Sequence, residues 1–228
     1  MSTNNLKISV VLPCRNEEKS LGRCLQNIKK VLVDNNLIGE IIVSDSSCDN
    51  SPAIAQDYGV KLIKHNQRGY GLAYQAGFKL AEGDYIFMAD ADGTYDFKEI
   101  PRFIKYLDEG YDLVIGNRFA RSLKVGVMPW SHQYLGNPIL SFLFRLFFKT
   151  KITDVHCGMR TIKKEALNKL NLKTPGMEFA SEMLIEASFK KLKIKELPID
   201  YLPRQGFSKL KTISDGLRHL ELMIRKAI

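Results

Sequence analysis

The sequence predicts an α/β protein in which helices cover both faces of a doubly wound, mostly parallel central sheet. Two patterns predict this class. Apolar, β-branched runs of strand length alternate with segments whose apolar residues recur at helical spacing, and such alternation is typical of parallel sheets. In addition, 228 residues with 45% hydrophobic side chains suffice for one ordinary α/β core. We therefore expect residues 1–228 to form a single domain.

The first unit illustrates the pattern. An apolar strand at residues 7–13 precedes a helix at 17–33, in which Leu21, Leu25 and Ile28 recur at helical spacing. The same reasoning predicts strands at 40–45, 60–64, 85–89 and 112–116, and helices at 52–58, 71–80 and 97–107. Because ligands of these sheets bind beyond the carboxyl ends of the strands, the residues that follow each strand are the candidates for a site.

The regular alternation stops after residue 116. A basic loop leads into residues 130–148, whose many Leu and Phe side chains predict surface helices with an unusually apolar face. A smaller β-α stretch follows, with strands expected at 158–162 and 194–201 and helices from 164 and at 178–190. Residues 213–228 have an apolar stripe flanked by charges, which predicts an amphipathic helix toward the C-terminus.

Composition limits the partners and the compartment. The 34 Lys and Arg outnumber the 25 Asp and Glu, and the net charge of +9 indicates an anionic partner. Nucleic acid is not expected, because no binding motif or clustered basic helix is present. The four cysteines lack paired C-x-x-C spacing and are expected to be reduced structural thiols. No export signal and no run of roughly 18 apolar residues, the length needed to span a bilayer, is found.

The triplet Asp90-Ala91-Asp92 follows the apolar run at 86–89. Two adjacent carboxylates repel each other, so a cation is their natural partner. Mg²⁺ and Mn²⁺ are bound by a few carboxylates together with substrate phosphates, which fits this pattern. The triplet therefore indicates a metal ion that holds a diphosphate.

Other interpretations of the triplet remain open at this point. It could be a solvated acidic turn, with Asp96 as the cap of the next helix. The run from Asp90 to Thr94 also matches the D-x-D-G-T signature of haloacid-dehalogenase-like phosphohydrolases, although their later Gly-Asp-x-x-x-Asp is absent. A dinucleotide site is not indicated, because Gly69-Tyr70-Gly71 is followed only by Gly77 and G-x-G-x-x-G is not met.

Four segments together resemble the family-two glycosyltransferases of GT-A fold: residues 10–17, residues 41–45, Gly69-Tyr70-Gly71 and Asp90-Ala91-Asp92. Arg118 and the string Arg204-Gln205-Gly206-Phe207-Ser208-Lys209 are similar to the polyprenyl-phosphate, or dolichyl-phosphate, mannosyl- and glucosyltransferases. The resemblance implies a GT-A-like fold. It also implies that residues 1–120 are the nucleotide-sugar-binding half and 121–228 the acceptor- and membrane-facing half.

The resemblance also implies roles for individual residues. Those implied to bind the nucleotide sugar are Pro13, Arg15, Glu17, Asp45, Asp90, Ala91, Asp92, Arg118, Arg204 and Lys209. Those implied to act in catalysis are Asp90, Asp92 and Arg118. The metal ligands would be Asp92, Asp90 and Thr94. The acceptor phosphate would be held by Arg118, Arg204, Ser208 and Lys209.

The function that this implies is metal-dependent, inverting transfer of a hexose, mannose or glucose, from a nucleotide-diphosphate sugar to a polyprenyl phosphate such as dolichyl or undecaprenyl phosphate. Mg²⁺ or Mn²⁺ would be the cofactor, with UDP and GDP both open. The enzyme would work at the cytoplasmic face of a membrane, either peripherally or anchored by a continuation past Ile228. Two alternatives remain. One is transfer to a soluble or polysaccharide hydroxyl, with Asp154 or Glu178 as base. The other is a non-catalytic nucleotide-sugar or membrane-binding module.

Overall fold

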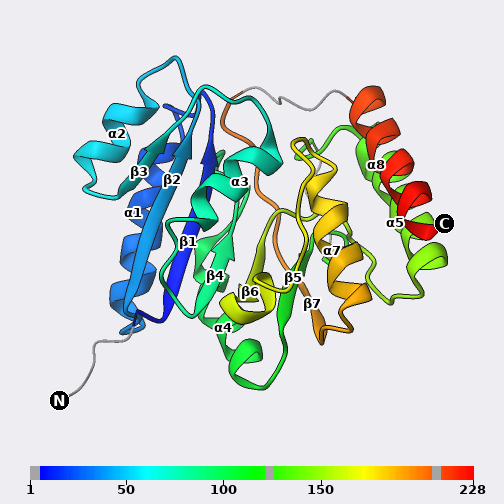
Figure 1. Ribbon diagram of the computed structural model, residues 1–228. Helices are drawn as coiled ribbons and strands as arrows, with labels where there is room; N and C mark the ends of the chain where they lie inside the picture. The colour runs from blue at the N-terminus through cyan, green and yellow to red at the C-terminus, as the bar shows by residue number, and fades with distance from the viewer. Residues whose placement is uncertain (1–5, 122–125, 207–211) are drawn as a thin grey trace.

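The computed structural model describes residues 6–121, 126–206 and 212–228 (Figure 1). One seven-stranded sheet has the order β3-β2-β1-β4-β6-β5-β7. Its strands are β1 (Ile8–Cys14), β2 (Gly39–Asp45), β3 (Lys61–Lys64), β4 (Tyr85–Met88), β5 (Leu113–Asn117), β6 (Arg160–Lys163) and β7 (Ile194–Pro198). The pairings are parallel except those of β6, which runs antiparallel to β4 and β5. The mostly parallel α/β architecture is confirmed.

The described helices agree with the predicted ones in order and approximate position. They are α1 (Leu21–Asp34), α2 (Ser51–Asp57), α3 (Tyr70–Phe78), η1 (Phe97–Glu99), α4 (Ile100–Asp108), η2 (His132–Gly136), α5 (Asn137–Phe148), α6 (Lys164–Leu167), α7 (Phe179–Phe189) and α8 (Thr212–Ala227). The helix predicted at 97–107 begins as the 3-10 turn η1, where the Asp96 carboxylate accepts a hydrogen bond from the Lys98 N–H at 3.0 Å. The cap interpretation of Asp96 is therefore correct.

The orientation of β6 is the one feature of the sheet that the sequence pattern did not indicate. The chain leaves β5 at its carboxyl end, forms η2 and α5, and enters the sheet again from that same edge (Figure 1). A strand that enters from this edge must run against its neighbours. As a result, the residues before β6 lie beside those that follow β4.

Helices cover both faces of the sheet, as predicted. On one face α3 packs against α7, and the rings of Tyr74 and Phe179 stack with their centroids 5.7 Å apart. On the other face Phe103 of α4 meets Phe87 of β4 at 5.8 Å. Helices α5 and α8 pack together beyond α7, at the β7 side of the molecule (Figure 1). No helix in the described part of the chain is long and apolar enough to span a bilayer.

Candidate active site

The turns that follow β1 and β2 are tied together by one hydroxyl. The Oγ of Ser47 donates to the buried carboxylate of Asp45 at 2.6 Å and accepts from the Asn16 N–H at 2.7 Å. The Glu17 N–H likewise reaches across to the Ser51 hydroxyl at 3.0 Å. Asn16 has a positive φ of 53°, which turns the chain sharply here. The residues predicted to hold the nucleoside thus share one rigid corner.

The predicted residues in this corner differ in accessibility. Pro13 and Arg15 are half-buried, whereas Glu17 is buried. The Ala91 carbonyl behind them accepts a hydrogen bond from the Ser20 hydroxyl at 2.7 Å. This bond fixes the main chain of the acidic triplet against the start of α1.

Asp92 is almost fully enclosed, and each of its carboxylate oxygens has a partner. Oδ1 accepts from the Thr94 N–H at 3.0 Å and from its hydroxyl at 2.6 Å, while Oδ2 pairs with Arg204 Nη2 at 2.8 Å. Arg204 Nη2 is also 3.6 Å from the Glu17 carboxylate. Thr94 therefore orients Asp92, and the cationic partner of Asp92 in this structure is a guanidinium.

Asp90 has a different environment. Its Oδ1 is buried without a hydrogen-bond partner. Burial, reinforced by the negative charge of Asp92, raises the pKa of Asp90 above its usual range, and Arg204 partly opposes this shift. A Cβ at Gly158 would lie 3.0 Å from Asp90 Oδ2 and from the Tyr70 hydroxyl oxygen. Only glycine leaves that space beside the carboxylate open.

The acidic pair fits a hard divalent cation. Two neighbouring carboxylates in a dry environment carry excess negative charge, one of their oxygens lacks a partner, and another already holds a cation. Among the described residues, no group of three or more His, Cys, Asp or Glu side chains could hold a metal. Mg²⁺ and Mn²⁺ commonly complete their coordination shells with substrate phosphates and water, so the protein needs to supply only one or two carboxylate ligands.

Arg118 lies deeper than its predicted role in phosphate binding requires. Its Nε and Nη2 atoms donate to the Asp154 carboxylate at 2.8 and 2.7 Å, and both side chains are buried. Its backbone N–H also donates to Asp154, at 2.9 Å. The guanidinium is 5.3 Å from the ring of Tyr201. The structure thus gives Arg118 a paired carboxylate before any phosphate is considered.

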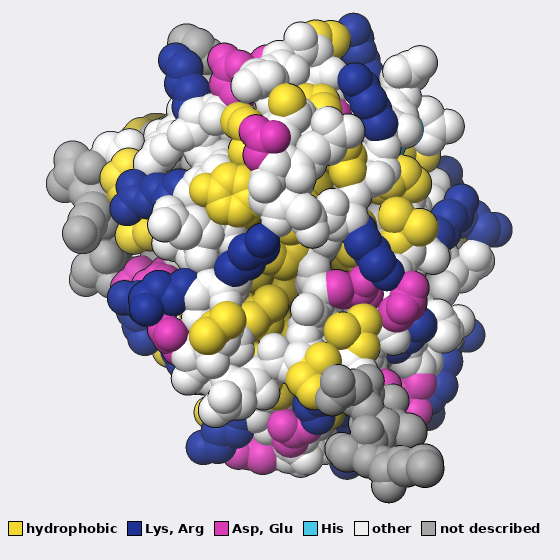
Figure 2. Space-filling model, turned by 90° about the vertical axis from the view of Figure 1, so that its left-hand side faces the viewer, with side chains coloured by type: hydrophobic (Ala, Val, Ile, Leu, Met, Phe, Trp, Pro, Cys, Tyr) yellow, Lys and Arg dark blue, Asp and Glu magenta, His cyan; other side chains and the backbone are white. Residues whose placement is uncertain are grey.

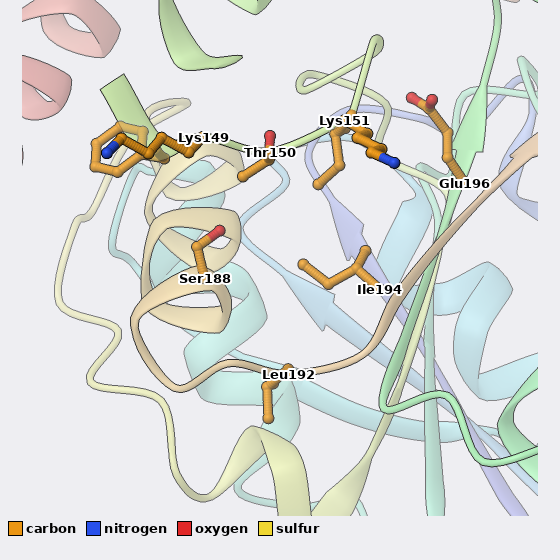
Figure 3. A pocket seen from close by; sticks show the side chains of 9 residues that line it. Lys149, Thr150, Lys151, Ser188, Leu192, Ile194 and Glu196 are labelled. Atoms are coloured by element: carbon orange, nitrogen blue, oxygen red, sulfur yellow. The ribbon is translucent and has the colours of Figure 1, made fainter. Parts of the chain in front are cut away.

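Asp154 is held in place from behind by Glu196 of β7. The Glu196 carboxylate accepts from the N–H groups of Thr153 and Asp154 at 2.9 and 2.7 Å. Glu196 also lines a cavity of about 380 Å³ between β7 and the ends of α5 and α7, shown in Figure 3. None of the residues that line this cavity is a predicted site residue.

Residues 201–206, called the strap below, cross the acidic triplet. The Leu202 N–H donates to Thr94 O at 2.9 Å, and the Gln205 N–H donates to Asp92 O at 3.0 Å. The strap therefore carries Arg204 to Asp92. The late segment that begins at Arg204 thus lies beside the acidic triplet. Ser208 and Lys209, predicted to hold phosphate, lie outside the described residues.

Several residues of the site were not assigned a role from the sequence. Ser47 joins the first two turns. Tyr95 belongs to no recognised motif, but its hydroxyl oxygen accepts a hydrogen bond from the Gly158 N–H at 2.8 Å. Tyr70 lies between Gly69 and Gly71, and no role was predicted for this tyrosine. Its position between two glycines that approach other backbone atoms was the available signal.

The surface charge can be compared with the anionic partner that the net charge of +9 indicates. On the side of the molecule that carries α2 and β3, Lys and Arg side chains are interspersed with Asp and Glu and do not form one continuous basic patch (Figure 2).

Cys14, Cys24 and Cys157 are buried free thiols, and burial raises the pKa of each to about 12. These three are therefore unreactive structural thiols.

Comparison with known proteins agrees with this geometry. Residues 9–170 match the model of the family described as "Glycosyl transferase family 2". The low-salt glycan biosynthesis hexosyltransferase Agl6 of Haloferax volcanii is 41% identical over 96% of the chain, and the chain spans 54% of that protein. The dolichyl-phosphate hexose transferase of the same organism is 29% identical, with 92% of this chain and 89% of that protein covered.

A solved structure shares the fold. It is glucosyl-3-phosphoglycerate synthase from Mycobacterium tuberculosis, in complex with Mn²⁺, UDP and glucosyl-3-phosphoglycerate. The TM-score is 0.76 at 22% identity, with 97% of this chain and 80% of that chain covered. This neighbour supports the GT-A assignment of the sheet. The family match covers most of the chain, and the chain therefore belongs to glycosyl transferase family 2.

Proposed function

We propose that the chain transfers a hexose, mannose or glucose, from a nucleotide-diphosphate sugar to a polyprenyl phosphate with inversion at the anomeric carbon. Mg²⁺ or Mn²⁺ is the proposed cofactor. Residues 1–120 would bind the donor and residues 121–228 the acceptor and the membrane. Support for the metal includes the fold neighbour described in complex with Mn²⁺ and UDP. Support for the lipid acceptor includes the relative described as a dolichyl-phosphate hexose transferase.

The observation that carries the proposal is the acidic pair beneath Arg204. Asp92 is fixed by Thr94 and faces a guanidinium at 2.8 Å, and Asp90 leaves one buried oxygen without a partner. A nucleoside diphosphate brings phosphates that need cations, and the pair offers carboxylates that need a cation. The metal would stabilise the negative charge that develops on the departing diphosphate. The corner formed by Asp45 and Glu17 is the proposed nucleoside end.

The described residues also bear on the choice of acceptor. Transfer to a hydroxyl requires a carboxylate that is free to accept its proton. Both oxygens of Asp154 are occupied by Arg118, whereas Glu178 Oε1 accepts the Gly176 N–H at 3.1 Å and its Oε2 is buried without a hydrogen-bond partner. A phosphate monoester has a second pKa near 6 and is largely dianionic at pH 7, so it needs no base. Asp154 would instead position Arg118 as the cation that meets the acceptor phosphate.

The proposed reaction is a single displacement. An oxygen of the acceptor phosphate bonds to the anomeric carbon as the bond from that carbon to the nucleoside diphosphate breaks, and the configuration inverts. Arg118 and Arg204 would reduce the repulsion between the two anions. No proton has to move in this step.

An apolar surface on η2, α5 and α8 is the proposed contact with the membrane. Its exposed side chains are Trp130, Tyr134, Leu135, Ile139, Phe142, Leu146, Phe147, Leu217 and Ile224. Arg145 on α5 and Arg225 and Lys226 on α8 add positive charge near these side chains. Aromatic, aliphatic and basic side chains in one surface are typical of proteins that bind anionic lipid surfaces.

Transfer itself is tested with radiolabelled UDP- and GDP-hexoses, Mn²⁺ or Mg²⁺ and a short polyprenyl phosphate. We expect butanol-extractable label from one donor only when metal is present. If no donor labels the lipid but label appears on added phosphorylated sugars or free polysaccharide, the lipid acceptor is wrong while the glycosyltransferase assignment stands.

Membrane binding is tested by sedimentation with vesicles that contain anionic phospholipid. The double variant Phe142→Ser with Leu146→Ser should release the protein from vesicles. The matched control is Val33→Ser with Ile38→Ser, which removes two exposed apolar side chains from the opposite half of the chain. Equal binding by both double variants would remove this surface from the proposal.

A further inference from the structure

Arg204 occupies an unusual position for a residue expected to bind phosphate. Its Nη2 lies 2.8 Å from Asp92 Oδ2 and 3.6 Å from the Glu17 carboxylate, so it bridges the two acidic groups of the proposed donor site. Its Nε is buried without a hydrogen-bond partner. The guanidinium therefore sits at the centre of the negative charge.

The Asp92 carboxylate offers little space for a second cation. Thr94 already makes two hydrogen bonds to Oδ1, so Oδ2 is the oxygen left for a positive partner, and Arg204 holds it. Asp92 is only 2% exposed beneath the strap. A metal ion that binds Oδ2 must therefore displace the guanidinium from that oxygen.

The strap allows such a displacement without unfolding. It is fastened to the triplet by backbone bonds from Leu202 to Thr94 and from Gln205 to Asp92, which do not involve the Arg204 side chain. Gly206, with φ of 107°, follows directly. The Arg204 side chain is 26% exposed and has room to swing toward solvent or a ligand while the backbone of the strap stays in place.

We propose that Arg204 serves two anions in turn: it neutralises Asp92 until a divalent metal arrives, and it then moves to the diphosphate of the nucleotide sugar. Metal and guanidinium compete for Asp92, and the diphosphate removes the competition because it takes the released guanidinium as its own partner. Metal alone consequently binds weakly, and metal and nucleotide bind with positive cooperativity. Arg204 is a positioning residue in this scheme. The inference rests on the proposed donor site.

The test compares Arg204→Gln with the wild type in two binding measurements. Electron paramagnetic resonance of free Mn²⁺ gives the affinity for the metal alone. Calorimetry with UDP, and separately GDP, at saturating Mn²⁺ gives the affinity for the nucleoside diphosphate. We expect the variant to bind Mn²⁺ alone about tenfold more tightly, which equals about 1.4 kcal/mol, and to bind the diphosphate at least about tenfold more weakly.

The matched control is Arg102→Gln, which removes the same charge from the ion pair with Glu99, formed at 2.8 Å on α4. It should leave both affinities unchanged. Arg204→Lys keeps the charge but loses the planar guanidinium, whose Nη2 reaches both acids, so its Mn²⁺ affinity should lie between those of the wild type and the glutamine variant. Thermal melting of each variant verifies folding.

The outcomes separate this inference from the proposed function. Opposite shifts for metal and diphosphate in Arg204→Gln support it. Unchanged or weaker binding of Mn²⁺ alone by that variant would overturn the competition, while nucleotide binding by the wild type would leave the proposed donor site intact. If the wild type binds neither UDP nor GDP with Mn²⁺ present, both the donor site and this inference are wrong.

Discussion

The two halves of the chain, residues 1–120 and 121–228, differ in their hydrogen bonding and in their exposed apolar side chains. In residues 1–120 the hydroxyls of Ser47 and Ser51 accept hydrogen bonds from the turn after β1, and the Ser20 hydroxyl donates to the segment after β4. Among the residues described there, the only exposed large apolar side chains are Val33 and Ile38. In the second half an antiparallel strand enters the sheet, and the helices beyond α7 expose an apolar surface. One half fixes polar groups in place, and the other exposes an apolar surface.

Besides the pairing of β6 and β7 with β4 and β5 in the sheet, the halves meet where the strap crosses the acidic triplet and where α3 touches residues 174–176. The first contact brings Arg204 to Asp92, and the second brings Gly71 against the Thr174 carbonyl. If the proposed function is correct, catalysis depends on the acidic pair of the first half, whereas stability depends on the contact between the two halves. The substitutions below test this division of roles.

The largest effect is expected at the acidic pair. Asp92→Ala removes the carboxylate that both Thr94 and Arg204 contact, and with it the proposed metal site. Loss of a metal's stabilisation of the leaving group amounts to several kcal/mol, so kcat should fall by about 10³-fold or more. Steady-state assays with varied Mn²⁺ measure it. The fold should survive, since the Arg204 side chain that loses its partner is partly exposed and water can solvate it; an active variant would contradict the metal role.

Asp154 is expected to matter more for stability. Asp154→Asn leaves the buried Arg118 guanidinium without its counter-charge, and breaking a buried pair from one side costs about 3–5 kcal/mol. Chemical denaturation measures this loss. The control is Asp200→Asn, which breaks the exposed pair with Arg121 and should cost less than about 1 kcal/mol. Similar costs for the two variants would mean that the Arg118 pair is not buried in solution.

The predictability of the two halves from the sequence also differs, for physical reasons. The first half is a series of short-range β-α units, so the local pattern places each strand end. Asp45, which ends β2, and Asp92, which follows β4, therefore lie at the same edge of the sheet. The orientation of β6 depends on where a connection of some forty residues returns to the sheet, which no local pattern records. Contacts between residues far apart in the sequence, such as Asp154 with Arg118, cannot be predicted from local patterns either.

The partners of charged residues are a second feature that could not be predicted from the sequence. The sequence indicated which residues are cationic near the site but not which carboxylates they contact. Arg118 and Arg204 both carry an acidic partner already, and Arg160, assigned no role, is fully buried against the carbonyl oxygens of Val155, Cys157 and Ala180 at 2.7–2.9 Å. Burial decides between a structural and a ligand-binding arginine, and burial follows only from the tertiary fold.

The junction of α7 and α8 should make stability depend on pH. The rings of His156 and His219 lie 4.4 Å apart, and the Ser181 hydroxyl is 2.7 Å from His219 Nδ1. Burial, with Arg160 nearby, lowers the pKa of His219 to about 4, from about 6.5 in an unfolded chain. The unfolded state therefore binds more protons between these values, and stability that is complete above about pH 6.5 falls as the pH drops toward 4.

This loss amounts to about 3 kcal/mol for His219 alone, and burial lowers the pKa of His156 in the same direction. Denaturant unfolding at pH 7 and at pH 4.5 measures it. His219→Gln keeps a hydrogen-bonding group beside Ser181 and should flatten the dependence. His65→Gln, at the far side of the sheet, should retain the wild-type dependence. A His219→Gln profile as steep as that of the wild type would show that this junction does not carry the effect.

The smallest effect sharpens the comparison at the contact between the halves. A Cβ at Gly71 in α3 would lie 2.1 Å from the Thr174 backbone oxygen, whereas at Gly216 in α8 it would meet no atom within 4 Å. Gly71→Ala should therefore cost about 1–3 kcal/mol through overpacking. The same change at Gly216 should stabilise the helix by up to about 1 kcal/mol. Because the two variants differ only in what the added methyl meets, thermal melts that shift in opposite directions identify a close backbone contact between the halves, and equal shifts would mean that α3 and residues 174–176 are not packed together in solution.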